Sequence, residues 1–170
     1  MVRYKFPRGA AASVALFILP LGGLAGLSPY VSPAAAKMRI ERLSILPAGG
    51  GAAHRFEVEL AETDAEKALG LMFRTQLSDT AGMLFWYRSP QDITMWMRNT
   101  YISLDMVFIR EDGLIARIEA EAEPLSERII AAGSPVHAVL ELAGGAAKRL
   151  DIKPGDRVEH RLFSGAPAAR

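Results

Sequence analysis

The 170-residue chain has no cysteine, which excludes disulfides, thiolate nucleophiles and thiolate metal sites. Its three histidines, His54, His137 and His160, lie far apart in the sequence and have no metal-ligand spacing. It also has no phosphate-binding loop, nucleophile elbow or dinucleotide fingerprint. We therefore expect no cofactor and no bound metal.

An excess of charge of either sign is also lacking. Lys and Arg total 20 and Asp and Glu total 19, and the basic residues form no stripe, so nucleic acid is not an expected partner. Half of the residues are hydrophobic, which favours one folded domain with a real core over a disordered chain.

The first 36 residues have the order of a secretory signal peptide. Arg3, Lys5 and Arg8 precede an apolar run over residues 14–27, and a small-residue stretch ends at Ala36. We expect cleavage after Ala36 and a periplasmic or secreted protein with no stable membrane span. Removing the three basic residues leaves 17 basic against 19 acidic residues, a net charge of −2 (17 − 19). Residues 37–163 are predicted to form one domain, and residues 164–170 a flexible tail.

Short alternating segments predict a mainly β (α+β) domain. Residues 54–61 and 136–143 alternate as half-buried strands do, and Thr63-Asp64-Ala65-Glu66 is a capping box that predicts a helix over residues 64–69. A second short helix is expected at residues 146–150. With seven or eight strands and no strand–helix alternation, the pattern favours a compact, mostly antiparallel β-barrel-like or sandwich domain.

The segment from Gly82 to Asp105 carries the densest mixture of polar and apolar side chains. It contains both tryptophans, and the next turn, Asp112-Gly113, is a strong two-residue hairpin signal. Such a turn fixes the register, so that paired residue numbers sum to 225. Asp105 then ends an otherwise apolar row, and a buried carboxylate requires a partner. We predict a nitrogen of Arg74 or Arg98, or the Asn99-Thr100 segment, within hydrogen-bond range of it.

Six ordered motifs resemble the domain of unknown function 192 (DUF192) family. They are Gly70-Leu71-Met72-Phe73-Arg74, Gly82-Met83-Leu84-Phe85, Trp96-Met97-Arg98-Asn99-Thr100, Leu104-Asp105, Asp112-Gly113 and Leu140-Glu141-Leu142. The resemblance covers Phe56 to Val158, and Ser103 departs from it because the family usually has Pro there. It implies a small, β-rich, often exported domain with no agreed activity.

Several polar side chains are expected to converge on one site. The predicted ligand-binding residues are Arg74, Trp96, Arg98, Asn99, Thr100 and Asp105. Charged and amide groups beside tryptophan suit a small polar ligand such as a sugar or an anion. The same residues also suit a purely structural arrangement, in which an arginine satisfies Asp105 and Asn99-Thr100 shapes a turn.

Three functions remain open from the sequence. The first is a monomeric, non-enzymatic domain that binds a small ligand or an envelope protein. The second is a hydrolase of an envelope saccharide, with Asp105 and Glu141 as its acid and base. The third is a structural or interaction protein without a small-molecule site. A minor alternative is Cu(I) binding by the thioethers of Met95 and Met97, which otherwise fill gaps in a core.

Overall fold

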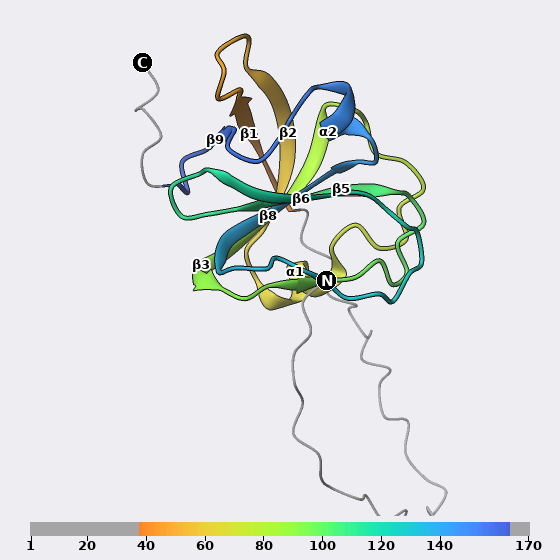
Figure 1. The fold of residues 1–170 in the computed structure, drawn as a ribbon. Coiled ribbons are helices and arrows are strands. Elements are labelled where there is room, and N and C mark those ends of the chain that lie inside the picture. Colours follow the sequence, from red (N-terminus) through yellow and green to blue (C-terminus); the bar gives the residue numbers. More distant parts are fainter. Residues whose placement is uncertain (1–37, 164–170) are drawn as a thin grey trace, which may run out of the picture. The chain divides into compact units, whose positions relative to one another are not determined.

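The computed structural model describes residues 38–163, which form a mainly β domain (Figure 1). The predicted signal peptide and tail lie outside the described residues. The elements are β1 (Arg39–Leu46), β2 (His54–Ala61), α1 (Asp64–Leu69), β3 (Ala81–Gln91), β4 (Thr94–Met95), β5 (Leu104–Ile109), β6 (Ile115–Ala122), β7 (Ile130–Ala131), β8 (Val136–Ala143), α2 (Ala146–Arg149) and β9 (Arg157–Glu159). Within this range, no helix is both long and apolar enough to cross a bilayer.

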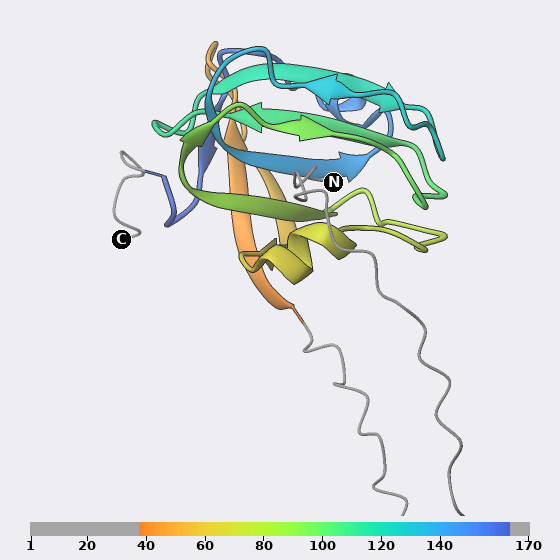
Figure 2. The same ribbon diagram turned by 90° about the horizontal axis from the view of Figure 1, so that it is seen from below.

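Seven strands form one curved sheet in the order β6-β5-β8-β3-β2-β1-β9, while β4 and β7 pair separately. Figure 2 shows the β1–β2 hairpin, in orange, running steeply across the direction of β6, β5, β8 and β3. The two edges of the sheet approach each other, because the Ile115 amide donates to the Asp156 carbonyl at 2.9 Å and the Val158 amide to the Gly113 carbonyl at 2.8 Å. The sheet is therefore a half-barrel.

The β2–β3 pair is parallel, whereas every other pairing in the large sheet is antiparallel. Residues 62–80 connect these two strands and include α1. The predicted capping box is present there: the Thr63 hydroxyl accepts from the Glu66 amide at 3.2 Å, and the Glu66 carboxylate accepts from the Thr63 amide at 2.8 Å. The prediction of a mainly β, barrel-like domain is confirmed. The parallel pairing of β2 with β3 was not predicted from the sequence.

The predicted register of the β5–β6 hairpin is correct in its centre and wrong at its ends. Val107 faces Ile118 as expected, but Ile109 faces Ile115 and Leu104 faces Ala122. The extra residue near Leu104 is Glu121, whose φ of 48° marks a bulge. At the other end, the turn is one residue longer than predicted, because the Arg110 amide donates to the Leu114 carbonyl at 3.0 Å, and a register shift beyond Ile109 restores the predicted pairing in the centre.

Both faces of the sheet are buried, and each has its own apolar cluster. The interior cluster lies on the concave face of the half-barrel and includes Leu43, Ile45, Val107 and Leu140. The methionine cluster lies on the opposite face and includes Met83, Met95, Met97, Met106, Phe85 and Phe108. Ala146 and Ala147 of α2 pack in the interior cluster, whereas Leu71, just after α1, packs in the methionine cluster. Figure 1 accordingly shows α2 above the sheet and α1 below it.

The alternation of polar and apolar residues from Ile93 to Arg98 predicts a full strand, but only Thr94–Met95 pairs. The alternation is nevertheless as predicted, since Ile93, Met95 and Met97 are buried and Arg98 is exposed. The sequence Ser89-Pro90-Gln91-Asp92 predicts a turn, but β3 continues to Gln91. The alternation of residues 157–163 predicts a closing strand, which in the structure ends at Glu159.

Candidate functional site

Asp105 is completely buried on the interior side of β5, and backbone amides satisfy it. Its Oδ1 accepts from the amides of Glu121 at 2.7 Å and Gly145 at 2.9 Å, and its Oδ2 accepts from the amide of Ala147 at 2.7 Å. The carboxylate therefore ties the β6 bulge and the first turn of α2 to β5. The predicted partners, an arginine or the Asn99-Thr100 segment, are wrong.

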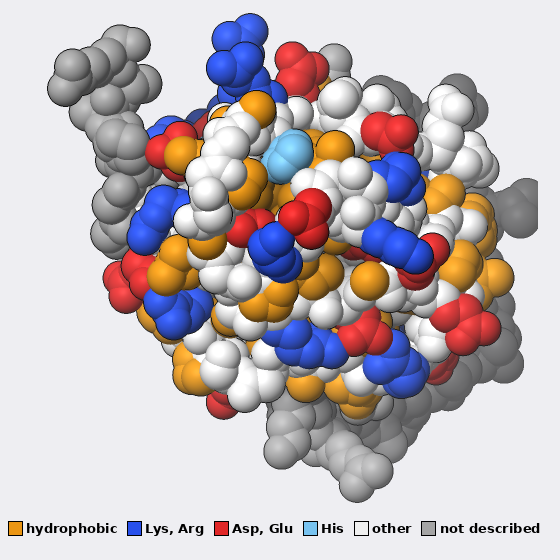
Figure 3. All heavy atoms as spheres, turned by 45° about the horizontal axis from the view of Figure 1, so that its top comes forward, with side chains coloured by type: hydrophobic (Ala, Val, Ile, Leu, Met, Phe, Trp, Pro, Cys, Tyr) orange, Lys and Arg blue, Asp and Glu red, His pale blue; other side chains and the backbone are white. Residues whose placement is uncertain are grey.

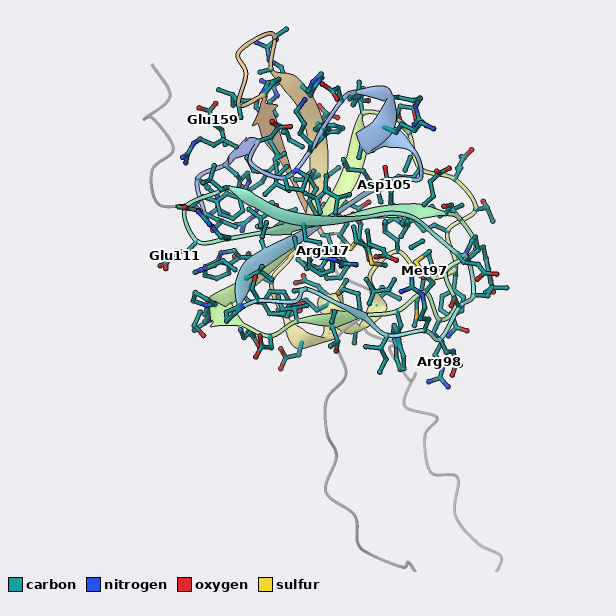
Figure 4. All side chains as sticks on the ribbon, in the orientation of Figure 1. Met97, Arg98, Asp105, Glu111, Arg117 and Glu159 are labelled. Atoms are coloured by element: carbon teal, nitrogen blue, oxygen red, sulfur yellow. The ribbon has the colours of Figure 1, made fainter. Side chains whose placement is uncertain are left out.

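The two predicted arginines have other partners. Arg74 forms a two-pronged ion pair with Glu59, with N···O distances of 2.6 and 2.7 Å. The Nε of Arg98 donates to Glu127 at 3.1 Å, and its guanidinium lies 5.0 Å from the ring centroid of Trp96. Figure 4 shows Arg98 at the periphery of the domain, with Met97 nearer the sheet. Neither arginine contributes to the Asp105 network.

Asn99 and Thr100 join three chain segments. The carbonyl of Asn99 accepts from the amide of Phe73 at 2.8 Å, and the carbonyl of Thr100 accepts from the amide of Leu125 at 3.0 Å. Asn99 has the left-handed φ of 56° that its short polar side chain tolerates. The predicted residues Arg74 and Trp96–Thr100 thus come together, whereas Asp105 lies apart from them, within the interior network.

The junction of these segments exposes large apolar side chains, which sequence reasoning missed. Phe73, Tyr101 and Leu125 are 56%, 50% and 57% exposed, and the rings of Phe73 and Tyr101 meet edge to face at 6.2 Å. Phe73 and Leu125 both have a φ of 63°. A left-handed conformation costs a residue with a side chain about 1–2 kcal/mol. We call these three residues the apolar surface; strained backbone of this kind cannot be read from the sequence.

The two carboxyl groups proposed as an acid–base pair lie on opposite faces of the sheet. Asp105 pairs with Leu142, and the next residue along β5, Met106, pairs with Glu141. Successive side chains of a strand point to opposite faces, so Asp105 faces the interior cluster and Glu141 the methionine cluster. Figure 4 agrees, since Asp105 and Met97 lie on opposite sides of the β5–β6 ribbon. The fold does not bring the pair to one scissile bond.

Glu141 is buried, with 4% of its surface exposed, and its carboxyl has no hydrogen bond or ion pair with any side chain or amide of residues 38–163. Burial raises its pKa from 4.5 to about 7, because a charged carboxylate loses its hydration there. An unpaired buried polar group costs several kcal/mol. Glu141 is therefore the most unusual titratable group of this part of the chain.

Methionines flank Glu141 on both neighbouring strands. Met83 of β3 and Met106 of β5 are its register partners, so all three side chains share one face in a single row. The row continues outward to Glu59 on β2 and Glu119 on β6. The close packing of β3 on β8 requires Gly82, because a Cβ there would lie 2.6 Å from the Glu141 carbonyl oxygen.

The outer acids of this row are paired with arginine. Glu59 binds Arg74, and Glu119 binds Arg117 and Arg128. These arginines lower the pKa of the Glu119 carboxyl, chiefly through its hydrogen bond with Arg128. Glu141 is thus the one acid of the row without a described cationic neighbour. No group of three or more His, Asp or Glu side chains in residues 38–163 has the arrangement of a metal site.

Two adjoining hollows lie elsewhere, beside the β1–β2 hairpin. They have volumes of about 540 and 420 Å³ and share Arg55, Phe56 and Thr80 as lining residues. Neither is lined by a predicted site residue. On the face in Figure 3, basic and acidic side chains alternate and do not gather into a patch of one sign.

Comparison with known proteins agrees with this description. The family model of DUF192, described as an uncharacterized ACR, matches residues 45–160. No curated protein matches the chain. A crystal structure of a protein of unknown function from Novosphingobium aromaticivorans DSM 12444 is 43% identical, with a TM-score of 0.70, and the match covers 82% of this chain and 100% of that one. A Sinorhizobium meliloti 1021 protein, described as a putative transcription regulator, is 44% identical with a TM-score of 0.71, over 72% and 95% of the two chains.

Proposed function

The chain belongs to the DUF192 family, and we propose that it is an exported, monomeric, non-enzymatic domain that binds another protein through its apolar surface. The observation that carries this proposal is the exposure of Phe73, Tyr101 and Leu125 where three chain segments meet, two of these residues having a left-handed backbone. Exposed apolar clusters on soluble domains mark interaction sites. A strained backbone conformation persists only where the surrounding structure holds it in place, and such conformations are concentrated at functional sites.

The charged and aromatic residues near the apolar surface favour a protein partner over a sugar or an anion. Arg98 and Glu127 form an exposed ion pair next to Trp96, and aromatic residues with arginine are the common anchors of protein interfaces. The cations proposed to hold an anion are already paired with Glu59 and Glu127. The expected partner is therefore an envelope protein that presents an apolar segment with charges of both signs at its edge.

Export is supported by the order of the first 36 residues and by the start of β1. Arg39, the first residue of β1, follows the proposed cleavage site by only three positions. Cleavage after Ala36 would therefore leave the described domain intact. Mass spectrometry of the protein recovered from the periplasm would test this, and a chain that retains its first 36 residues in the cytoplasm would contradict it.

Site-specific photo-crosslinking in cells tests the interaction. A photoreactive phenylalanine in place of Tyr101 should form a discrete adduct with an envelope protein, whereas the same group in place of Ile40, which is 55% exposed on β1, should not. Combined Phe73→Ser and Leu125→Ser substitutions should remove the adduct without loss of fold. Equal crosslinking from both positions would contradict the proposal, and so would an adduct that consists only of two copies of this chain.

A further inference from the structure

The row across the centre of the sheet suggests a second site, away from the apolar surface. Met83, Glu141 and Met106 occupy neighbouring strands at matched register and point to the same face. Neighbouring strands are about 4.8 Å apart, so two thioethers lie on either side of one carboxyl group. All three residues are buried. From this geometry we infer that the protein binds one Cu(I) ion between the Glu141 carboxylate and the thioethers of Met83 and Met106.

The distribution of methionine supports a soft-metal site. Four buried methionines, Met83, Met95, Met97 and Met106, lie in the methionine cluster, and the interior cluster on the other face of the same sheet has none. Thioether sulfur is a soft ligand that selects Cu(I) over hard cations. Met97 packs in the same cluster and is 1% exposed. The copper ligands are thus centred on Glu141, not on the pair Met95 and Met97.

Charge balance identifies the ion more closely. A buried carboxyl group either stays protonated or needs a positive charge or hydrogen bonds to ionise, and no Lys, Arg or His of residues 38–163 acts on Glu141. One monovalent cation makes the site neutral, whereas a divalent ion would leave an uncompensated charge among Phe85, Phe108 and the methionines. Ca²⁺ and Mg²⁺ also require six or more oxygen ligands, and Zn²⁺ is held by three or four thiolate, imidazole or carboxylate ligands, of which this site has only one.

The other charged groups of the row do not compete for this role. Glu59 is two strands away from Glu141 and is paired with Arg74, and Glu119 is two strands away on the other side and is paired with Arg117 and Arg128. The arginines that could neutralise Glu141 are therefore held at the two ends of the row. With a cation bound to Glu141, each of the three acids of the row would have a positively charged partner.

Competitive titration of the full chain with Cu(I) under anaerobic conditions tests the inference. A chromophoric Cu(I) chelator reports the free metal, and the wild-type protein should remove one equivalent from it. Glu141→Gln should weaken binding by about 100-fold or more, since it leaves a buried cation without its counter-charge. Met83→Leu and Met106→Leu should each weaken it by about tenfold, because leucine keeps the volume and removes the sulfur ligand.

The matched control is Met38→Leu, which makes the same chemical change at the margin of the methionine cluster. It should alter affinity by less than about twofold, and all variants should retain the wild-type near-UV circular dichroism. X-ray absorption at the copper edge should show sulfur and oxygen neighbours. Absence of binding, equal affinity for Zn²⁺, unchanged affinity in Glu141→Gln, or equal losses in Met38→Leu and Met83→Leu would each overturn the site.

Discussion

Two buried carboxyl groups, one strand apart, show how differently the two faces of this sheet are built. On the interior face, Asp105 accepts hydrogen bonds from three backbone amides. On the other face, Glu141 lies between two methionines and has no partner among residues 38–163. Hydrogen-bonded burial stabilises a fold, whereas unpaired burial destabilises it and is retained where it serves another purpose. The first acid is therefore structural and the second is the candidate for function.

Substitution of Asp105 should have the largest effect on stability. Asp105→Ala leaves the amides of Glu121, Gly145 and Ala147 buried without an acceptor, and we expect a loss of about 3–5 kcal/mol in the free energy of unfolding. Urea denaturation of the purified protein measures this loss. A variant as stable as wild type would show that the two acids do not differ in the way proposed.

The pH dependence of stability should reveal Glu141. In the unfolded chain its carboxyl titrates near 4.5, and in the folded protein near 7, so between these values unfolding releases a proton. The free energy of unfolding therefore falls as pH rises through this window, by about 3 kcal/mol in all, and then levels off above pH 7. Glu141→Gln, which cannot titrate, should lack this fall.

Urea denaturation from pH 4 to 8 compares the two proteins directly. The difference between them, not the slope of either alone, isolates Glu141 from the other carboxyl groups. Parallel curves for wild type and Glu141→Gln would mean that Glu141 is compensated in solution, and the contrast between the two faces would then disappear.

Exchange of methionine for leucine should have a smaller effect. Met106→Leu in the absence of metal should cost less than about 1.5 kcal/mol, because the change conserves volume in a cluster of flexible side chains. On the interior face, Leu140→Ala should cost about 2–5 kcal/mol because it leaves a cavity. Thermal unfolding distinguishes the two outcomes. A Met106→Leu loss as large as that of Leu140→Ala would show that the methionines are needed chiefly for packing.

The smallest expected effect concerns an outer acid of the row. Arg74→Gln removes the ion pair with Glu59, whose side chain is partly exposed, and should cost less than about 1 kcal/mol at physiological salt. The cost should shrink further in 1 M salt because the charges are screened. A loss that is larger and independent of salt would indicate that Glu59 is held as tightly as Asp105.

Local patterns predicted much of the fold. The Thr63 capping box gave the correct start of α1. The Asp112-Gly113 signal predicted the hairpin and its central register, although the turn is one residue longer than predicted and a register shift between Phe108 and Ile109 compensates for it. The bulge at Glu121 could not be predicted, because it coincides with a hydrogen bond from the Glu121 amide to the side chain of Asp105 on the neighbouring strand. The parallel pairing of β2 with β3 was missed for a related reason: it depends on long-range order, not on any local motif.

The candidate site was predicted only in part. Alternation placed Asp105 inward and Glu141 on the face opposite Leu140, as observed. All three partners of Asp105 are backbone amides, which no side-chain pattern reveals, and two of them lie at the start of α2, 40 and 42 residues away. Likewise, Met83 and Met106 become neighbours of Glu141 only because β8 inserts between β3 and β5.

The position of β8 has a consequence for synthesis. In the pairing order, β8 is the only strand that connects the β5–β6 hairpin with the group β3, β2 and β1, and the contact of β9 with residues 113–115 comes later still in the chain. A ribosome that has released everything before residue 136 has therefore made two separate strand groups with no common sheet. The domain should reach its folded form only near the completion of translation, and such a delay would keep the chain unfolded for the export proposed above.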